Sequence, residues 1–268
     1  MTATDSAFVG SIPALYDRHL GPMLFAPYAA DLAARVRTSP AKRVLEVAAG
    51  TGIVTRALHQ TLPGATIVAT DLNAGMIAHA AQQLAAPNVT WAEANAMALP
   101  FDAASFDLIV CQFGAMFFPD RVIAFREAHR VLVPGGRFLF NIWASLDHNE
   151  IPRIIAHTVA AAFPDDPPSF IERTPHGHGN PAVTEAELRD AGFSRVDVEI
   201  VELPSRAPSA ADPAIGFCQG SPARMEIAAR DAGRLTEVTE AATRALAQRF
   251  GPGPIEAPMR ANVFDATK

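Results

Sequence analysis

The sequence predicts an α/β fold built around a parallel sheet, and three observations predict it. Apolar runs of strand length alternate with helical patterns between residues 43 and 143, which is typical of strands joined by crossover helices. A turn of small residues separates the first apolar run from the helical pattern that follows it. The chain has 268 residues, of which 49% are hydrophobic, so it can bury the core of one α/β domain with appended segments.

The first part of the chain gives its elements in order. Residues 5–37 are predicted to form two helical stretches, broken around Gly21-Pro22. Four residues fall on one side of the first stretch: Phe8, Ile12, Leu15 and Tyr16. Strands are predicted at 43–47, 65–70, 88–92, 106–111 and 136–143, with helices at 52–61, 73–85 and 120–132. Ligands bind such sheets at the carboxyl ends of the strands.

The pattern changes after residue 148, where helical patterns and a Pro- and Gly-rich loop replace the regular alternation of strands and helices. The predicted order is a helix near 149–163, a loop at 164–181, a short helix at 184–191, a strand at 193–203, helical segments over 209–250 broken at Gly220-Ser221-Pro222 and at Gly233, and a last strand at 258–266.

The most informative segment is the turn after the first strand, where Val-Leu-Glu-Val at 44–47 runs into Ala-Ala-Gly-Thr-Gly at 48–52. A tight turn of small residues at a helix N-terminus lets backbone N–H groups approach a ligand that a side chain would block. Nineteen residues after Gly52, a second apolar run ends on Asp71. An acid at the tip of the second strand of a βαβ unit is placed to accept hydrogen bonds from a ribose diol. The sequence therefore predicts half of a nucleoside-binding site.

The turn lacks the third glycine of the dinucleotide fingerprint, because Thr55 stands at that position. It resembles instead motif I of the class I S-adenosylmethionine-dependent methyltransferases, acid-x-Gly-x-Gly-x-Gly. Glu46 stands at the acid, and Gly50 and Gly52 match the last two glycines. Ala48 replaces the first glycine, which predicts a backbone angle there that tolerates a methyl group.

Further motifs carry a resemblance to the small-molecule methyltransferases related to the ubiquinone and menaquinone biosynthesis enzymes. They occur in the order and at about the spacing seen in that group: Asp71-Leu72-Asn73, Asn95 to Phe101, Ser105 to Val110, Phe117 to Asp120, Arg130 to Gly136 and Arg137 to Phe140. The close resemblance covers about residues 40–143. It implies a Rossmann-like sheet of seven strands, with helices on both faces and an antiparallel last strand.

The resemblance also implies a domain organisation. Residues 1–38 would form an N-terminal helical lid, and residues 39–145 the S-adenosylmethionine-binding core. Residues 146–268 would complete the same domain, with segments that set substrate specificity and with the last two strands. A helical insertion would precede the last strand.

Several residues receive cofactor roles from the resemblance. In the family the acid equivalent to Glu46 lies below the amino-acid end of the cofactor. Asp71 would face the ribose, although an acid there also suits a helix N-cap. Asn95 stands where relatives often have an aspartate that accepts from the adenine amine, and an asparagine can accept through its carbonyl oxygen. Met76 suits either core packing or contact with adenine. The full implied set is Tyr16, Glu46, Ala48, Gly50, Thr51, Gly52, Asp71, Leu72, Met76, Asn95, Ala96 and Gln112.

The implied reaction is an in-line displacement, in which an acceptor atom attacks the methyl group and S-adenosylhomocysteine departs. Gln112 ends the fourth strand, where the methyl-transfer centre lies in this fold; it and Tyr16 are candidate positioning residues. His148, after the fifth strand, is the candidate base, although the chemistry requires no acid–base pair. His176 and His178 form a His-x-His pair without a third ligand at a suggestive spacing, so no metal site is predicted.

Composition limits the partners. The net charge is −6, which argues against a nucleic-acid substrate because such binding depends on clustered Lys and Arg. No apolar run reaches the ~18 residues of a membrane span. The N-terminus shows no secretory pattern, and Cys111 and Cys218 make no disulfide framework, so the protein is expected in the cytoplasm.

The acceptor is expected to be a neutral or hydrophobic small molecule, because residues 1–38 and 144–258 are apolar and rich in Ala and Pro. Three alternatives stay open. The chain could bind S-adenosylmethionine without transferring its methyl group, or use that cofactor for another reaction. It could also be a nicotinamide-dependent oxidoreductase on a related sheet, which Thr55 disfavours. The oligomeric state is open.

Overall fold

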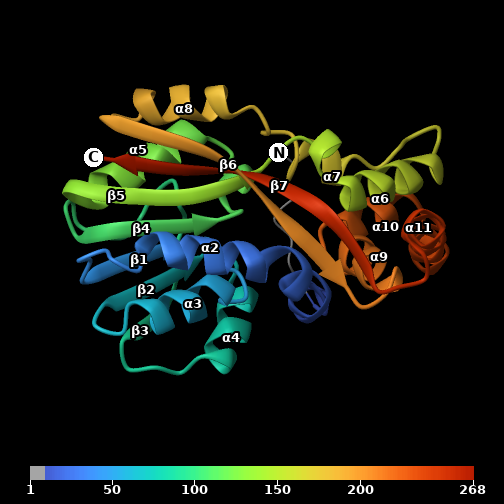
Figure 1. Cartoon of the computed structure of the whole chain (residues 1–268), viewed down its shortest axis with the longest axis horizontal. Coiled ribbons are helices and arrows are strands. Elements are labelled where there is room, and N and C mark those ends of the chain that lie inside the picture. The colour runs from blue at the N-terminus through green and yellow to red at the C-terminus, as the bar shows by residue number, and fades with distance from the viewer. Residues whose placement is uncertain (1–9) are drawn as a thin grey trace. The chain divides into compact units, whose positions relative to one another are not determined.

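A seven-stranded sheet runs through the computed structural model, which describes residues 10–268 (Figure 1). The strand order is β3-β2-β1-β4-β5-β7-β6. Strands β1 to β5 pair in parallel, whereas β7 pairs with β5 in the antiparallel direction. The predicted fold class and the antiparallel last strand are therefore confirmed. The strands are β1 Arg43–Val47, β2 Thr66–Asp71, β3 Val89–Glu93, β4 Phe106–Gln112, β5 Leu132–Trp143, β6 Arg195–Ala207 and β7 Ile255–Thr267.

Helices connect the strands and fill the insertion between β6 and β7, as predicted. They are α1 Ile12–Leu15, η1 Tyr16–Phe25, α2 Ala26–Val36, α3 Ile53–Thr61, α4 Ala74–Gln83, η2 Ala115–Phe117, α5 Arg121–Val131, η3 Leu146–His148, α6 Glu150–Ala161, α7 Phe170–Arg173, α8 Pro181–Asp190, α9 Ala211–Gln219, α10 Ala223–Asp231, η4 Ala232–Arg234 and α11 Leu235–Phe250. The short α7 lies inside the segment that the sequence predicted as a loop.

The chain divides into two compact units that each combine segments distant in the sequence. Unit 1 consists of Met1–Pro27, Ala144–Gly177 and Glu202–Arg260. Unit 2 consists of Tyr28–Trp143, His178–Val201 and Ala261–Lys268, and it holds β1 to β5. The division into a lid, a core and a C-terminal part stays a prediction.

Within unit 2, helices cover both faces of the sheet. Side chains along a strand alternate between the two faces. Phe138 and Phe140 of β5 lie with their ring centroids 5.9 and 5.4 Å from that of Phe125 in α5. Trp143 points to the opposite face and meets Tyr28 of α2 edge-on at 5.4 Å. Strands buried on both faces are continuous apolar runs, which explains the composition of β4 and β5.

The predicted break at Gly21-Pro22 is wrong. Pro22 lies inside η1, a π-helix, and the N–H of Ala26 donates to the carbonyl of Gly21, five residues earlier. A proline breaks an α-helix because it lacks an N–H and its ring meets the carbonyl four residues before it. The π-helical pattern moves the hydrogen bonds to residues five apart, so the helix continues past Pro22. Residues 5–9 of the predicted first helix, with Phe8, lie outside the described residues.

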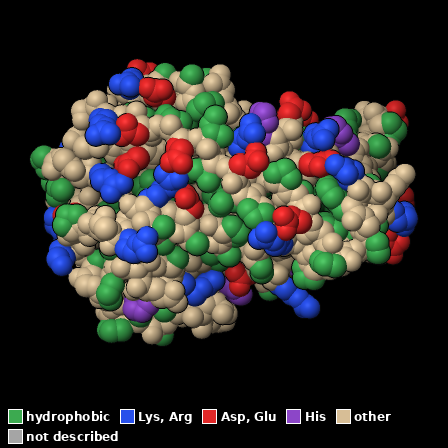
Figure 2. All heavy atoms as spheres, viewed as in Figure 1, with side chains coloured by type: hydrophobic (Ala, Val, Ile, Leu, Met, Phe, Trp, Pro, Cys, Tyr) green, Lys and Arg blue, Asp and Glu red, His purple; other side chains and the backbone are tan. Residues whose placement is uncertain are grey.

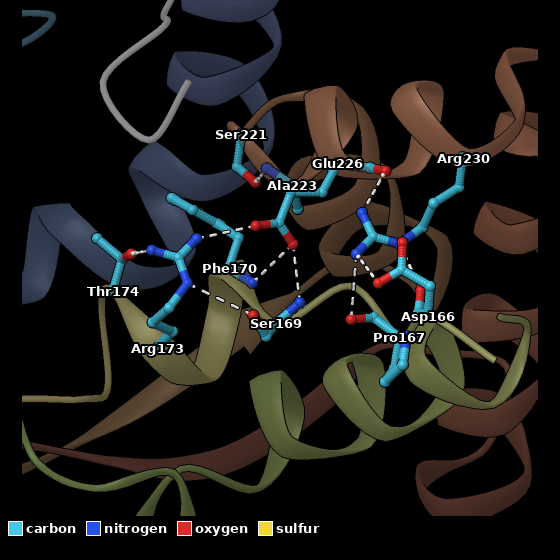
Figure 3. A network of polar contacts seen from close by, with 10 residues as sticks. All are labelled: Asp166, Pro167, Ser169, Phe170, Arg173, Thr174, Ser221, Ala223, Glu226 and Arg230. Atoms are coloured by element: carbon cyan, nitrogen blue, oxygen red, sulfur yellow. Dashed lines mark hydrogen bonds and ion pairs between the residues drawn. The ribbon is translucent and has the colours of Figure 1, made fainter. Parts of the chain in front are cut away.

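In unit 1, two side chains of α10 hold the segment 166–173 (Figure 3). Glu226 accepts from the N–H groups of Ser169 and Phe170 at 2.7 and 3.0 Å, and its other oxygen accepts from Arg173 at 2.8 Å. One turn later, Arg230 donates to the carbonyl and the carboxylate of Asp166 at 2.5 and 3.0 Å. The side chain of Ser169 does not cap α7, so Glu226 satisfies the N–H groups at its start.

The surface carries charges of both signs. On the face drawn in Figure 2, Lys and Arg side chains are interspersed with Asp and Glu side chains. Among residues 10–268, no helix has the length and hydropathy needed to cross a membrane.

Glu226→Ala is expected to lower the free energy of unfolding by about 1–3 kcal/mol, because it leaves two backbone N–H groups and a guanidinium without their acceptor. The same change is expected to speed tryptic cleavage after Arg173. Chemical denaturation and timed proteolysis measure the two effects.

Glu240→Ala is the matched control on α11, since Glu240 pairs with Arg244 at 3.7 Å and both side chains are exposed. An exposed pair of this kind contributes little, so neither measurement should change. Equal effects in the two variants would contradict the role given to Glu226.

Candidate functional site

The turn between β1 and α3 alternates through the left-handed region of backbone space. Ala48, Gly50 and Gly52 have φ angles of 56°, 56° and 78°. The expectation that residue 48 has a backbone angle suited to a methyl group is therefore wrong. An L-residue pays roughly 1–2 kcal/mol in this region, because its Cβ crowds the following carbonyl. The fold imposes this angle on Ala48 despite that strain.

The two glycines of the turn serve different purposes. A Cβ on Gly52 would lie 2.7 Å from the ring of Trp91 and 3.1 Å from Cβ of Ala80, so Gly52 allows α3 to start close to β3 and α4. A Cβ on Gly50 would meet nothing within 4 Å. The space beside Gly50 is thus open to a ligand, whereas the space beside Gly52 is filled by the protein.

Asp71 ties the end of β2 to this turn. Its Oδ2 accepts from the N–H of Gly50 at 2.9 Å, and its Oδ1 accepts from the N–H of Asn73 at 2.8 Å. The N-cap of α4 is Asn73, whose side chain accepts from Met76, so Asp71 is not the helix cap. Burial raises the pKa of Asp71, and the N–H groups of Asn73 and Gly50 oppose that shift. The N–H of Leu72 is a third donor to this carboxylate, which leaves one of its four lone-pair sites for a ligand hydroxyl.

Glu46 is a buried acid in the middle of this region. It is 1% exposed, and its Oε2 has no hydrogen-bond partner among residues 10–268. Burial raises the pKa of Glu46 to about 8; Thr55 opposes the shift and the charge of Asp71 adds to it. A buried acceptor without a partner is costly, which points to a group that completes the site.

The residues predicted at the adenine end follow β2 and β3. Leu72 is 57% exposed, an unusual position for a large apolar side chain next to a buried turn. Met76, a residue of α4, has a buried side chain that is 3% exposed. Asn95 is exposed, and its Oδ1 accepts from the N–H of Met97 at 2.9 Å in a turn that includes Ala96.

Gln112 ends β4 and pairs in register with Asn141 of β5. The next residue, Phe113, has a φ of 52°, and its N–H donates to Asn141 Oδ1 at 3.0 Å. A Cβ on Gly114 would lie 2.4 Å from that of Ala48, so the alanine in the first turn requires a glycine here. Asn141 and Gly114 were not among the residues predicted from the sequence. A single asparagine inside the apolar run of β5 was the available signal.

Unit 2 therefore brings most of the predicted cofactor residues to the carboxyl ends of β1 to β4: Glu46, Ala48, Gly50, Thr51, Gly52, Asp71, Leu72, Asn95, Ala96 and Gln112. Two candidates belong to unit 1. Tyr16 stacks on Phe25 with ring centroids 4.7 Å apart. His148 is exposed, and its Nδ1 accepts from Arg260 at 3.2 Å.

The His-x-His pair does not form a metal site in the described part of the chain, where no group of three His, Cys, Asp or Glu side chains is placed to hold an ion. His176 is buried and its Nδ1 donates to the carbonyl of Ala144 at 2.9 Å. Burial lowers the pKa of His176 to about 4, so it is neutral at physiological pH.

The arrangement suits a nucleoside that also carries an amine. Asp71 offers a lone pair near the open space beside Gly50, and Leu72 exposes an apolar surface next to it. Glu46 supplies an acid with an unpaired oxygen, which a cationic amine would complete.

Comparison with known proteins identifies the family. The methyltransferase domain family matches residues 45–140. A ubiquinone/menaquinone biosynthesis C-methyltransferase of Rhizobium etli (strain CIAT 652) is 33% identical over 174 residues, which cover 60% of this chain and 67% of that protein. A protein of the same name from Agrobacterium fabrum is 32% identical over 176 residues, with the same coverage.

Solved structures share the fold. The YcgJ protein of Bacillus subtilis superposes with a TM-score of 0.59 at 22% identity, covering 90% of this chain and 98% of that one. The phosphoethanolamine N-methyltransferase 2 of Haemonchus contortus, in complex with S-adenosyl-L-methionine, gives a TM-score of 0.63 at 17% identity, covering 100% and 60%. Together with the sequence relatives, these likenesses show that the chain belongs to the class I S-adenosylmethionine-dependent methyltransferases.

Proposed function

We propose that this protein transfers the methyl group of S-adenosylmethionine to a neutral or hydrophobic small molecule. The observation that carries the proposal is the Asp71–Gly50 hydrogen bond beside an open space at the carboxyl end of the sheet. The relatives named for C-methylation in quinone biosynthesis support an acceptor with a hydrophobic ring.

The cofactor would be held by residues on both sides of the turn. Asp71 accepts from a ribose hydroxyl beside the open space at Gly50. Leu72 packs against adenine, and Asn95 and Ala96 lie beside its edge. Glu46 pairs with the amino group, which removes the penalty of its unpaired oxygen. When bound, S-adenosylmethionine supplies a methyl group already activated by the positive charge on sulfur.

The protein's part in the transfer is alignment and exclusion of water. In favourable intramolecular models, alignment alone contributes about 7–11 kcal/mol to lowering a barrier. We assign Gln112 to positioning at the end of β4. We assign residues 1–38, with Tyr16, to a lid that covers the cofactor. Segments within residues 146–268 would set acceptor specificity.

His148 is our candidate base for acceptors that must lose a proton. Arg260 can only donate, so its contact engages the Nδ1 lone pair of His148. A base role therefore requires Arg260 to turn away, for example toward Glu202, to which it already donates at 2.9 Å. Two buried, unpaired cysteines, Cys111 and Cys218, are compatible with the reducing cytoplasm in which we place the reaction.

Asp71→Ala is expected to weaken the binding of S-adenosylmethionine and S-adenosylhomocysteine by roughly 10- to 100-fold, since it removes a charge-assisted hydrogen bond to the ribose and releases the turn. Isothermal titration calorimetry measures the affinities. Asp71→Asn keeps one acceptor oxygen and should give an intermediate affinity.

Glu93→Ala is the matched control, because Glu93 is the residue of β3 paired in register with Asp71 and is exposed. Its substitution should leave both affinities unchanged. If wild-type, well-folded protein binds neither compound, the cofactor site proposed here is wrong.

Glu46 should make both stability and cofactor binding depend on pH. Its pKa of about 8 lies above the ordinary value of 4.5, so the folded protein holds this proton more tightly than the unfolded chain. The stability that Glu46 contributes is full below pH 4.5 and declines as the pH rises to about 8. Melting temperatures from pH 5 to 8.5 should therefore fall more steeply for the wild type than for Glu46→Gln.

Pairing with a cationic amine favours the ionised form of Glu46, so cofactor binding near pH 7 should release up to about one proton. Calorimetry in buffers of different ionisation enthalpy counts the protons. The Glu46→Gln variant should release fewer, and equal release from both proteins would rule out this role.

A further inference from the structure

A buried amide lies beside the place where we propose that methyl transfer occurs. Asn141 of β5 pairs in register with Gln112 at the end of β4, and it is 0% exposed. The residues around it in β5 are apolar, from Phe138 to Trp143. An amide removed from water is costly unless both its oxygen and its nitrogen form hydrogen bonds.

The oxygen of this amide is engaged. The N–H of Phe113 donates to Asn141 Oδ1 at 3.0 Å and also to the backbone carbonyl of Asn141 at 3.2 Å. Because an N–H can only donate, the amide must present its oxygen to Phe113, and the opposite orientation is excluded. The bond also supports Phe113 in the left-handed region, where a bulky residue is strained.

The nitrogen of the amide is not engaged. Within residues 10–268, Asn141 Nδ2 is buried and has no hydrogen-bond partner. Its position is fixed by the engaged oxygen, so this donor cannot be satisfied by turning the amide. A buried donor without an acceptor is unusual, and an oxygen of a ligand or of a water molecule would satisfy it.

The orphan donor lies on the same face of the sheet as Glu46. Glu46 pairs with Val110 of β4, which lies two residues before Gln112, and residues paired in register share a face. Asn141 lies two strands away from Glu46 across the sheet and two residues further along it, so their Cα atoms are roughly 12 Å apart. A ligand amine at Glu46 therefore leaves Asn141 to a group further along the sheet.

Three aromatic rings pack together at this end of β5. Phe113 stacks on Trp143 with centroids 3.8 Å apart, and Tyr28 meets both rings edge-on. The hydroxyl of Tyr28 is itself engaged, since it donates to the carbonyl of Val201 at 2.9 Å. The rings thus form an apolar cluster at this end of β5, where Asn141 supplies a neutral donor.

We propose that Asn141 donates a hydrogen bond through Nδ2 to an oxygen of the methyl acceptor, which makes the acceptor a phenol or an enol and not an amine. This inference rests on the function proposed above. A donor at that oxygen stabilises the phenolate or enolate, whose charge lies next to the reacting atom. A nucleophilic amine has a single lone pair, so a hydrogen bond from Nδ2 to that nitrogen would occupy the pair that must attack the methyl carbon.

The transfer balances without a further reactant. The electron pair of the acceptor oxygen or of its adjacent carbon forms the bond to the methyl carbon. The pair of the carbon–sulfur bond stays on sulfur, which becomes neutral in S-adenosylhomocysteine. The acceptor's O–H or C–H proton passes to solvent.

The test compares phenols with matched amines: catechol, hydroquinone and naphthol against aniline, benzylamine and naphthylamine, with S-adenosylhomocysteine release as the readout. The wild type should methylate members of the phenol set only. Asn141→Asp keeps an oxygen for Phe113 but loses the neutral donor, so kcat/KM should fall roughly 10- to 100-fold. The affinity for S-adenosylmethionine should be unchanged.

Asn262→Asp is the matched control. Asn262 is 2% exposed on the neighbouring strand β7, and its Nδ2 already donates to the carbonyl of Gly179 at 3.0 Å. This change should lower the melting temperature without lowering kcat/KM. If Asn141→Asp does not fold, Asn141→Leu removes the donor, adds no charge and leaves the Phe113 N–H its bond to the backbone carbonyl of residue 141, so kcat/KM should fall to a similar extent.

Methylation of the amines, or equal losses of kcat/KM in the Asn141 and Asn262 variants, would overturn the inference. So would a protein that binds S-adenosylmethionine yet methylates no phenol, which leaves the cofactor site standing. Absence of cofactor binding would instead overturn the proposed function, and this inference with it.

Discussion

The hydrogen bonds of Asp71 are the interaction on which the site depends. One carboxylate joins the end of β2 to the N–H of Gly50 and to the N–H of Asn73, where α4 begins. The turn that it holds contains three residues in the left-handed region, including Ala48, whose methyl group makes that angle unfavourable. A strained turn persists only where its surroundings fix it. Asp71 provides that constraint and still faces the open space beside Gly50.

Two buried polar side chains lower the stability of the free protein because each has an atom without a hydrogen-bond partner. Glu46 and Asn141 lie on one face of the sheet, each buried and each with one atom left unpaired. In the free protein these atoms reduce stability, because their desolvation is not compensated. Ligands that pair with these atoms, the cofactor with Glu46 and the acceptor with Asn141, would recover that loss, so binding and folding stability are coupled through the same face.

The sequence predicted what depends on local pattern. The bounds of β1 to β4 agree with the structure to within one residue, because apolar runs bounded by small residues mark them. Pro22 was misleading, since its effect depends on whether the helix is α or π. Asn141 was missed because its importance depends on register with Gln112, which no local pattern encodes. For the same reason the sequence could name His148 but could not reveal its contact with Arg260.

The late position of β7 in the chain has a consequence for synthesis. Residues 261–267 are the partner of β5, and they leave the ribosome after every other strand has been made. Until then one side of β5, with its run of unpaired backbone groups and aromatic side chains, is available to other nascent chains. The helices between β6 and β7 lengthen that interval by the time needed to translate about forty residues. This chain order thus leaves β5 as an unpaired edge strand for most of synthesis, and such an edge favours aggregation.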